Sequence, residues 1–230
     1  MSKTVLLTAG GTGGHLFPAQ ALASELSRRG WTVELATDER ADKYGTEFPA
    51  RKVHIIASAT IRGRNPIALA KTAFQLLFGT LQARKVIKAL QPDVVAGFGG
   101  YPTFPPMYAA RLTNTPSILH EANAVMGRAN KLLAKGVSAI ATSVPIEDLP
   151  SDLSSKLVET GNPVRDAVLD AAELNFTPPA SGGPLKLLVF GGSQGARFFS
   201  DLVPPAVAEL SDEQRKRIKI VQQCRPEDME

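Results

Sequence analysis

The chain has 230 residues, 43% of them hydrophobic, and its 26 lysines and arginines against 22 aspartates and glutamates give a formal net charge of +4. This apolar content is ample for a packed core and excludes a disordered protein. The small positive charge suits an anionic ligand or an anionic membrane surface and does not indicate nucleic-acid binding. Cys224 is the only cysteine, so an internal disulfide is excluded and a reducing compartment is expected. No apolar run is long enough to span a membrane.

Short apolar runs alternate with helical patterns along the chain. Strands are predicted at residues 5–9, 32–36, 53–56, 94–97, 117–119, 139–142, 185–190 and 218–222. Helices are predicted at residues 19–29, 66–90, 103–112 and 125–134, followed by one that ends near Leu210. Pro18 is placed in the first turn of the first helix, where proline is tolerated. This rhythm is typical of an α/β protein in which helices flank a parallel sheet.

The opening pattern of the chain occurs a second time after residues 174–184, whose proline, glycine and serine content is typical of a linker. The repeat consists of an apolar strand, a glycine turn at residues 191–195 and a helix. Two such copies predict two similar domains with a ligand site where the turns converge. We expect one domain at residues 1–163 and the beginning of a second at residues 164–230.

Four glycines occur within residues 10–14, directly after the first predicted strand. Glycine lets the backbone approach a ligand, and the free N–H groups of a following helix attract phosphate. The spacing does not fit the dinucleotide fingerprint, because its third glycine would fall on Leu16. Nor does it fit the phosphate-loop motif, because His15 stands where Gly-Lys would close it. We predict a phosphate cradle of another kind, with a turn that needs glycine only for packing as the alternative.

His15 follows this loop directly and is a candidate general base or phosphate-bonding group, with a capping or structural histidine as the alternative. Residues 97–102 and 120–123 also follow predicted strands, residues 161–165 are taken to follow a further one, and ligands bind at the carboxyl ends of parallel strands. In these segments Asn123 and Arg165 are candidates, although a turn residue and a surface cation are the simpler interpretation of each. No Asp-x-Asp sequence occurs and the three histidines are far apart, so spacing indicates no divalent-metal site.

Together these motifs resemble the MurG family, the membrane-associated GlcNAc transferases of bacterial peptidoglycan synthesis. Five motifs occur in the family's order: TAGGTGGH at residues 8–15, GFGGYP at 97–102, HEAN at 120–123, GNPVR at 161–165 and GGSQGA at 191–196. One motif would be weak, whereas five in order are specific. The sequence departs from the pattern at Ala122, where the family usually has glutamine.

The resemblance implies a two-domain GT-B fold that uses no cofactor and no metal. It also implies inverting transfer of GlcNAc from UDP-GlcNAc to the 4-hydroxyl of undecaprenyl-pyrophosphoryl-MurNAc-pentapeptide, at the cytoplasmic face of the inner membrane. By position, the donor would contact Thr12, Gly13, Gly14, Asn123, Arg165 and Ser193. Helix N-termini and Arg165 can stabilise the leaving diphosphate without a metal, and His15 would be the catalytic base. Other cell-wall synthesis proteins are further expected partners, and nucleic acid is not.

The predicted helix at residues 66–90 carries an apolar stripe, made of Ile67, Ala70, Phe74, Leu77, Phe78 and Leu81. Basic residues surround the stripe: Arg62, Arg64, Lys71, Arg84, Lys85 and Lys88. Such a helix can lie on an anionic leaflet, although an ordinary stripe that faces the core has the same pattern.

The second domain is expected to be incomplete, because only two strands and one helix can be identified after the linker. About 50 residues cannot cover both faces of a parallel sheet, so the chain alone is expected to be inactive. Two other functions are compatible with the pattern. One is a non-catalytic module that binds a sugar nucleotide or the lipid precursor at the membrane surface. The other is a nicotinamide oxidoreductase, against which the failed fingerprint counts.

Overall fold

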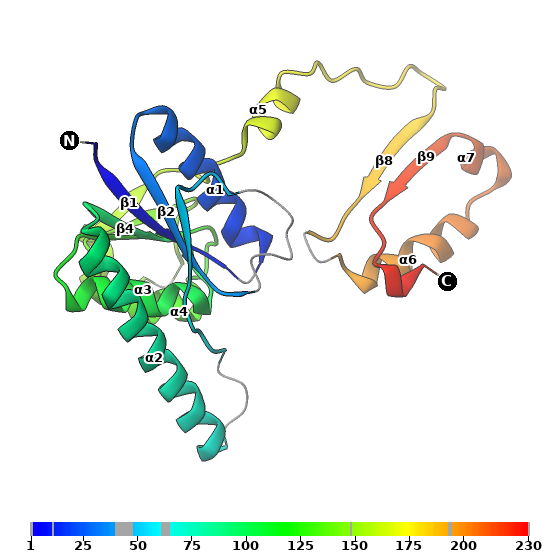
Figure 1. Ribbon diagram of the computed structural model, residues 1–230. Helices are drawn as coiled ribbons and strands as arrows, with labels where there is room; N and C mark the ends of the chain where they lie inside the picture. Colours follow the sequence, from blue (N-terminus) through cyan, green and yellow to red (C-terminus); the bar gives the residue numbers. More distant parts are fainter. Residues whose placement is uncertain are drawn as a thin grey trace. The chain divides into compact units, whose positions relative to one another are not determined.

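The structure is a computed structural model that describes residues 2–10, 12–39, 48–60, 65–147, 149–192 and 195–229. The chain forms two compact units, residues 1–170 and 171–230 (Figure 1). Residues 164–170, which the sequence pattern assigns to the beginning of the second domain, cluster with the first unit. Two of these residues contact helix α1 (Gly13–Arg28). The guanidinium of Arg165 lies over the ring of Phe17, and Asp166 forms an ion pair with Arg28.

The first unit is built on a seven-stranded parallel sheet with the order β3-β2-β1-β4-β5-β6-β7, which agrees with the predicted α/β class. The strands are β1 (Thr4–Thr8), β2 (Thr32–Thr37), β3 (Lys52–Ile55), β4 (Val94–Gly97), β5 (Ser117–Glu121), β6 (Ala139–Thr142) and β7 (Leu157–Glu159). The helices are α1, α2 (Pro66–Leu90), α3 (Phe104–Leu112), α4 (Arg128–Leu133) and α5 (Asp166–Ala172), and the last spans the boundary between the units. Short 3-10 turns lie at Tyr101–Thr103, Ala134–Gly136 and Ser151–Lys156.

The core lies on both faces of this sheet. Val5 and Leu7 of β1 pack with helix α1, whereas Leu6 packs with helices α2 and α3. Successive side chains of a strand point to opposite faces, so this division follows directly from the alternation. All three side chains are at most 1% exposed, as expected of a central strand in a parallel sheet that helices cover on both sides.

Two predicted boundaries are wrong in ways that affect the site. Helix α1 begins at Gly13, so Pro18 lies inside it instead of in its first turn. A proline there already has a helical φ and removes only one backbone hydrogen bond near the helix start. Strand β5 continues to Glu121, two residues beyond its predicted end. Its polar residues His120 and Glu121 pair with Ala141 and Thr142 of β6 and are buried, which an apolar pattern does not detect.

The second unit contains a two-stranded parallel sheet of β8 (Leu185–Val189) and β9 (Ile218–Gln222). Helices α6 (Arg197–Ala208) and α7 (Asp212–Lys216) connect the two strands. Among the residues of this unit that the structure describes, none is buried.

Helix α2 is the longest helix, and its N-terminal half extends beyond the rest of the first unit (Figure 1). Within the helix, the buried residues are Gly79, Thr80, Ala83 and Ile87, all in its C-terminal half. Across the described ranges, no helix is long and apolar enough to cross a membrane.

Candidate functional site

Four of the predicted segments lie at the same edge of the first unit's sheet. They follow β1, β4, β5 and β7, which are all parallel, so the carboxyl ends of these strands share one edge. The strand order reverses between β1 and β4, because β2 and β3 lie on one side of β1 and the later strands lie on the other. Open α/β sheets bind ligands at such a switch point. The first two glycine loops follow the two strands that flank it.

The first glycine loop combines a packing role with an open helix start. A Cβ at Gly10 would lie 2.9 Å from Cγ of Pro102 and 3.1 Å from Oγ1 of Thr37, so this glycine is required for packing. A Cβ at Gly14 would meet nothing nearer than Oγ1 of Thr12, at 3.8 Å. Packing therefore explains Gly10 but not Gly14, which is exposed. Gly11 lies outside the described residues.

The start of helix α1 is not capped by the side chain of its N-cap residue. Thr12 is extended, with φ −145° and ψ 157°, and makes no side-chain capping bond. Its Oγ1 instead lies 3.1 Å from Nδ1 of His15. The predicted donor contacts Gly13 and Gly14 form the first turn, where backbone N–H groups have no partner within the helix and the helix dipole favours an anion.

The second glycine loop packs against His15. Gly99 and Gly100 have φ values of +90° and +78°, which glycine adopts without strain. A Cβ at Gly99 would lie 3.1 Å from Cδ2 of His15, and one at Gly100 would lie 3.3 Å from its Nδ1. The buried Thr103 hydroxyl fixes the loop by donating to the carbonyl of Gly99, at 2.7 Å. These glycines thus allow the loop to hold the imidazole closely.

The electrostatic surroundings of His15 favour its neutral form. Burial is the largest effect and lowers the pKa of His15 below its usual 6.5. A hydrogen bond to the Gly10 backbone and the negative charge of Glu121 act in the opposite direction. A neutral imidazole can accept a proton, so the structure keeps His15 in the state that a general base needs.

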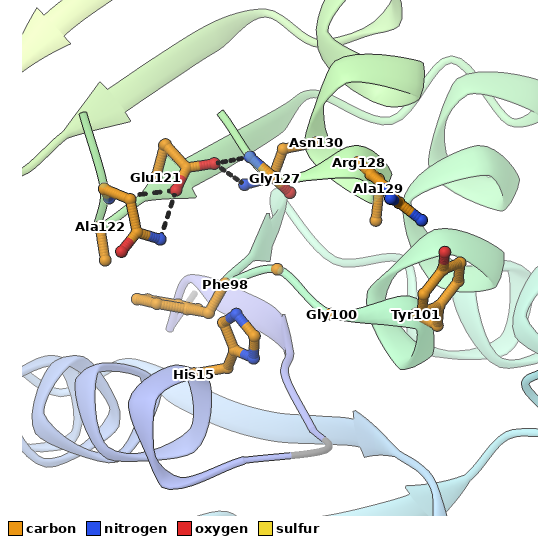
Figure 2. Close-up of a pocket in the computed structure, with 12 residues that line it drawn as sticks. His15, Phe98, Gly100, Tyr101, Glu121, Ala122, Gly127, Arg128, Ala129 and Asn130 are labelled. Atoms are coloured by element: carbon orange, nitrogen blue, oxygen red, sulfur yellow. Dashed lines mark hydrogen bonds between the residues drawn. The ribbon is translucent and has the colours of Figure 1, made fainter. Parts of the chain in front are cut away.

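A cavity of about 240 Å³ opens beside His15 (Figure 2). Its walls come from the loop after β4, which includes Phe98 and Tyr101, and from the segment between Glu121 and Asn130. Asn123, a predicted donor contact, lines it as well. Pockets that enclose a whole drug-sized ligand measure about 300–1,000 Å³, so this cavity has room for only part of a nucleotide sugar.

Glu121 is the centre of the hydrogen bonds beneath this cavity, and it is only 3% exposed. Its Oε1 accepts from the backbone N–H and from Nδ2 of Asn123, both at 3.1 Å. Its Oε2 accepts from the backbone N–H of Gly127 and from Nδ2 of Asn130, both at 2.9 Å. The same Nδ2 of Asn130 lies 3.1 Å from the carbonyl of His120.

Arg165 reaches helix α1 from the segment after β7. Its guanidinium lies 3.9 Å from the centroid of the Phe17 ring, a cation–π contact two residues beyond His15 in the sequence. The same segment also meets β5, since Nε2 of His120 lies 3.4 Å from the carbonyl of Gly161. Arg165 is therefore held against α1 and is not a free surface cation.

The structure brings together His15, Thr12, Gly13, Gly14, Asn123 and Arg165 at one edge of the first unit. Ser193 lies outside the described residues, so its predicted role remains a prediction. Sequence reasoning missed two residues of this edge, Glu121 and Asn130. Glu121 could have been found, because it lies within the quoted HEAN motif. Asn130 gives no local signal, since it belongs to helix α4, and only the fold brings it to Glu121.

Comparison with known proteins gives consistent matches. The model of the glycosyltransferase family 28 N-terminal domain matches residues 5–142. A Brucella anthropi protein is 56% identical over 224 residues, which are 97% of this chain and 60% of that protein. A Sinorhizobium medicae protein is 54% identical over 98% of this chain and 60% of its own length. Both are named UDP-N-acetylglucosamine--N-acetylmuramyl-(pentapeptide) pyrophosphoryl-undecaprenol N-acetylglucosamine transferase.

A solved structure supports the same relationship. Acinetobacter baumannii MurG matches with a TM-score of 0.70 and 28% identity, over 98% of this chain and 62% of that one. The glycosyltransferase of kitacinnamycin shares the fold at 18% identity and a TM-score of 0.67, over 97% of this chain and 66% of that one. The chain thus spans about 60% of the length of the curated relatives that it matches. The matched motifs, the sheet order and the family model agree, and the chain belongs to glycosyltransferase family 28.

Proposed function

We propose that this chain supplies the acceptor side and part of the donor site of an inverting GlcNAc transferase. The reaction would move GlcNAc from UDP-GlcNAc to the 4-hydroxyl of undecaprenyl-pyrophosphoryl-MurNAc-pentapeptide. The observation that carries the proposal is the meeting of four family motifs at one sheet edge. Relatives named for this transfer are 52–56% identical over 97–100% of this chain.

In this proposal two groups of residues at this sheet edge act on different parts of the reaction. The open first turn of α1 and the guanidinium of Arg165 face the charge that builds on the leaving diphosphate. His15 accepts the proton of the attacking hydroxyl, since burial keeps its imidazole neutral near pH 7. Direct displacement by the hydroxyl at the anomeric carbon inverts its configuration, and no covalent enzyme intermediate is required.

The test uses a hybrid in which this chain replaces the matching segment of the Brucella anthropi relative. The hybrid is incubated with UDP-GlcNAc and a short-prenyl MurNAc-pentapeptide lipid, and the product is analysed by mass spectrometry and NMR. The proposal expects a β-linked disaccharide on the 4-hydroxyl. Binding of either substrate without turnover, in a hybrid that folds, would instead support a non-catalytic module.

We also propose that helix α2 seats the protein on an anionic membrane, at the face where a lipid-linked acceptor would be reached. Its stripe does not face the core: Ile67 is 78% exposed, Phe74 71% and Leu77 59%. This exposure supports the membrane interpretation over an ordinary core stripe. Lys71, Arg84, Lys85 and Lys88 add positive charge on the same helix, and an apolar face with basic flanks binds anionic leaflets. Arg62 and Arg64 lie outside the described residues.

Vesicle sedimentation tests this membrane contact. Binding to vesicles that contain phosphatidylglycerol is expected to exceed binding to neutral vesicles and to fall in Phe74→Asp. Phe176→Asp is the matched control, because Phe176 is 84% exposed but lies outside α2. Equal loss of binding in both variants, or binding that ignores the anionic lipid, would contradict the proposal.

A further inference from the structure

We propose that Glu121 is a positioning residue that shapes the pocket wall and sets the direction of the Asn123 amide. Its carboxylate fixes the segment from residue 121 to residue 130 and turns the carbonyl oxygen of Asn123 away from itself. That oxygen then serves as an acceptor for a hydroxyl or an amide N–H of a sugar. The inference deepens the proposed function and rests on it for the identity of the sugar.

All the acceptor positions of the Glu121 carboxylate are occupied by donors of this chain. Each of its two oxygens accepts two hydrogen bonds, from Asn123 on one side and from Gly127 and Asn130 on the other (Figure 2). A carboxylate offers about four acceptor sites, so these four donors fill them. A general base needs a free lone pair within reach of the proton that it removes. Glu121 has none to offer, whereas His15 lines the same cavity as a neutral imidazole.

The side-chain amide of Asn123 has a fixed orientation. A carboxylate accepts only, so an amide beside it must present its NH2 group and not its oxygen. Nδ2 of Asn123 lies 3.1 Å from Oε1 of Glu121, which fixes the amide orientation and leaves Oδ1 on the other side. Asn123 is exposed and lines the cavity. Its contact with a ligand is therefore that of an acceptor, which suits sugar hydroxyl and N–H groups and disfavours phosphate oxygens.

Glu121 joins separate parts of the segment from residue 121 to residue 130. Gly127 precedes helix α4, Asn130 lies within it, and Asn123 follows strand β5. One buried carboxylate thus ties the end of a strand to the start of the next helix. Loss of such a group removes the acceptor of four donors on three residues, one of them the buried Asn130, which costs more than loss of one hydrogen bond.

The first experiment uses this chain without any ligand. In Glu121→Gln, the Nε2 group of the glutamine must face one of the two donor pairs, so two donors lose their acceptor. Amide hydrogen exchange at Gly127 or at Asn123 is expected to quicken by about 10- to 100-fold. The pKa of His15, followed by NMR, is expected to fall, because the nearby negative charge that raises it is removed. Glu159→Gln removes the same charge at an exposed site and is expected to change neither.

The second experiment is a double-mutant cycle on kcat/KM in the hybrid enzyme. If Glu121 acts through Asn123, Glu121→Gln in an Asn123→Ala background causes little further loss. If Glu121 were the general base, Glu121→Gln would instead lower kcat/KM by about 100- to 10,000-fold in both backgrounds. That result would overturn the proposal. Asn123→Asp keeps the proposal testable if Glu121→Gln does not fold. It sets two carboxylates against each other at an exposed position, and activity equal to the unmodified enzyme would contradict the assigned orientation.

The two experiments separate this inference from the proposed function. A folded hybrid that transfers no GlcNAc would sink the proposed function but leave the hydrogen-exchange and His15 titration results to decide the role of Glu121. Unchanged exchange at both amides together with an unchanged His15 pKa would refute the positioning role even if the transfer is confirmed.

Discussion

The two units of the chain differ in how much apolar surface they bury. This difference indicates which unit can hold functional side chains in a fixed geometry. In the first unit, strands such as β1 are enclosed by helices on both faces, and Leu6, Leu7 and Leu119 are 0% exposed. In the second, Leu188 is 65% exposed and Val221 is 69% exposed. Side chains can be held in a fixed geometry only on a packed scaffold. The hydrogen bonds of Glu121, the contact of His15 with Thr12 and the contact of Arg165 with Phe17 accordingly belong to the first unit.

The largest expected effect is on folding itself. Residues 1–170, expressed alone, are expected to unfold cooperatively, whereas residues 171–230 alone are expected to lack cooperative unfolding, since a two-stranded sheet is marginal in water. Thermal unfolding followed by circular dichroism, together with amide NMR dispersion, measures both fragments. A cooperative transition in residues 171–230 would remove the contrast between the units.

The catalytic contribution of the first unit is tested through His15. In the hybrid enzyme, His15→Ala is expected to lower kcat by about 100- to 10,000-fold if His15 is the general base. His54→Gln serves as the control, because His54 pairs with Glu34 on strand β2 and is distant in sequence from the glycine loops. Near-normal turnover of His15→Ala would leave His15 a structural or phosphate-bonding role.

The pH dependence follows from the same residue. The pKa of His15 is lowered from 6.5, so the base stays neutral to a more acidic pH than an exposed histidine does. As the pH falls through that lowered pKa, the imidazole becomes protonated and the rate is lost. The acidic limb of kcat/KM should therefore lie below pH 6.5. A limb above that value would show that another group titrates.

Core truncations in the two units give the next largest difference. Leu119→Ala is expected to lower the free energy of unfolding by about 2–5 kcal/mol, because its side chain is fully buried in the first unit. Leu188→Ala removes the same atoms from an exposed site and is expected to change it by no more than about 0.5 kcal/mol. Urea unfolding of the whole chain measures both variants. Similar losses would show that the second unit is packed.

The smallest effect concerns donor binding by Arg165. Arg165→Ala is expected to weaken UDP-GlcNAc binding by about 1.5–3 kcal/mol if the guanidinium makes a charge-assisted bond to the diphosphate. Arg29→Ala removes an exposed arginine that pairs with Glu25 on α1 and is the control. Calorimetric titration of the hybrid enzyme compares them. Equal affinities in Arg165→Ala and the unmodified hybrid would remove Arg165 from the donor site.

Local sequence patterns predict the alternation of strands and helices well, because parallel strands and covering helices have distinct apolar periods. The same patterns fail where polar residues are buried. His120 and Glu121 end the apolar run at Leu119, yet the strand continues through them and places Glu121 under the cavity. Helix α1 begins within the glycines, six residues before its predicted start at residue 19, because glycine is a poor helix former and does not indicate a helix locally.

The candidate site was predicted to a different degree for each residue. The glycine loops give strong local signals, since glycine-rich strand ends have few explanations other than close packing or ligand approach, whereas the position of His15 leaves a base and a structural histidine equally open. Which glycine serves packing and which leaves space is set by Pro102 and Thr37, which are distant in sequence from Gly10. The contacts between Arg165 and Phe17, and between Asn130 and Glu121, are also long-range, so no spacing within one segment reveals them.

The most direct test of the account is GlcNAc transfer measured side by side for residues 1–230 and for the hybrid enzyme, with labelled UDP-GlcNAc and the lipid acceptor. The account places the acceptor contacts on the first unit and requires a complete second domain to hold the donor in line. It predicts sustained turnover by the hybrid and none by residues 1–230. Comparable turnover by residues 1–230 alone would contradict the placement of the donor site, and a folded hybrid without any transfer would contradict the proposed reaction.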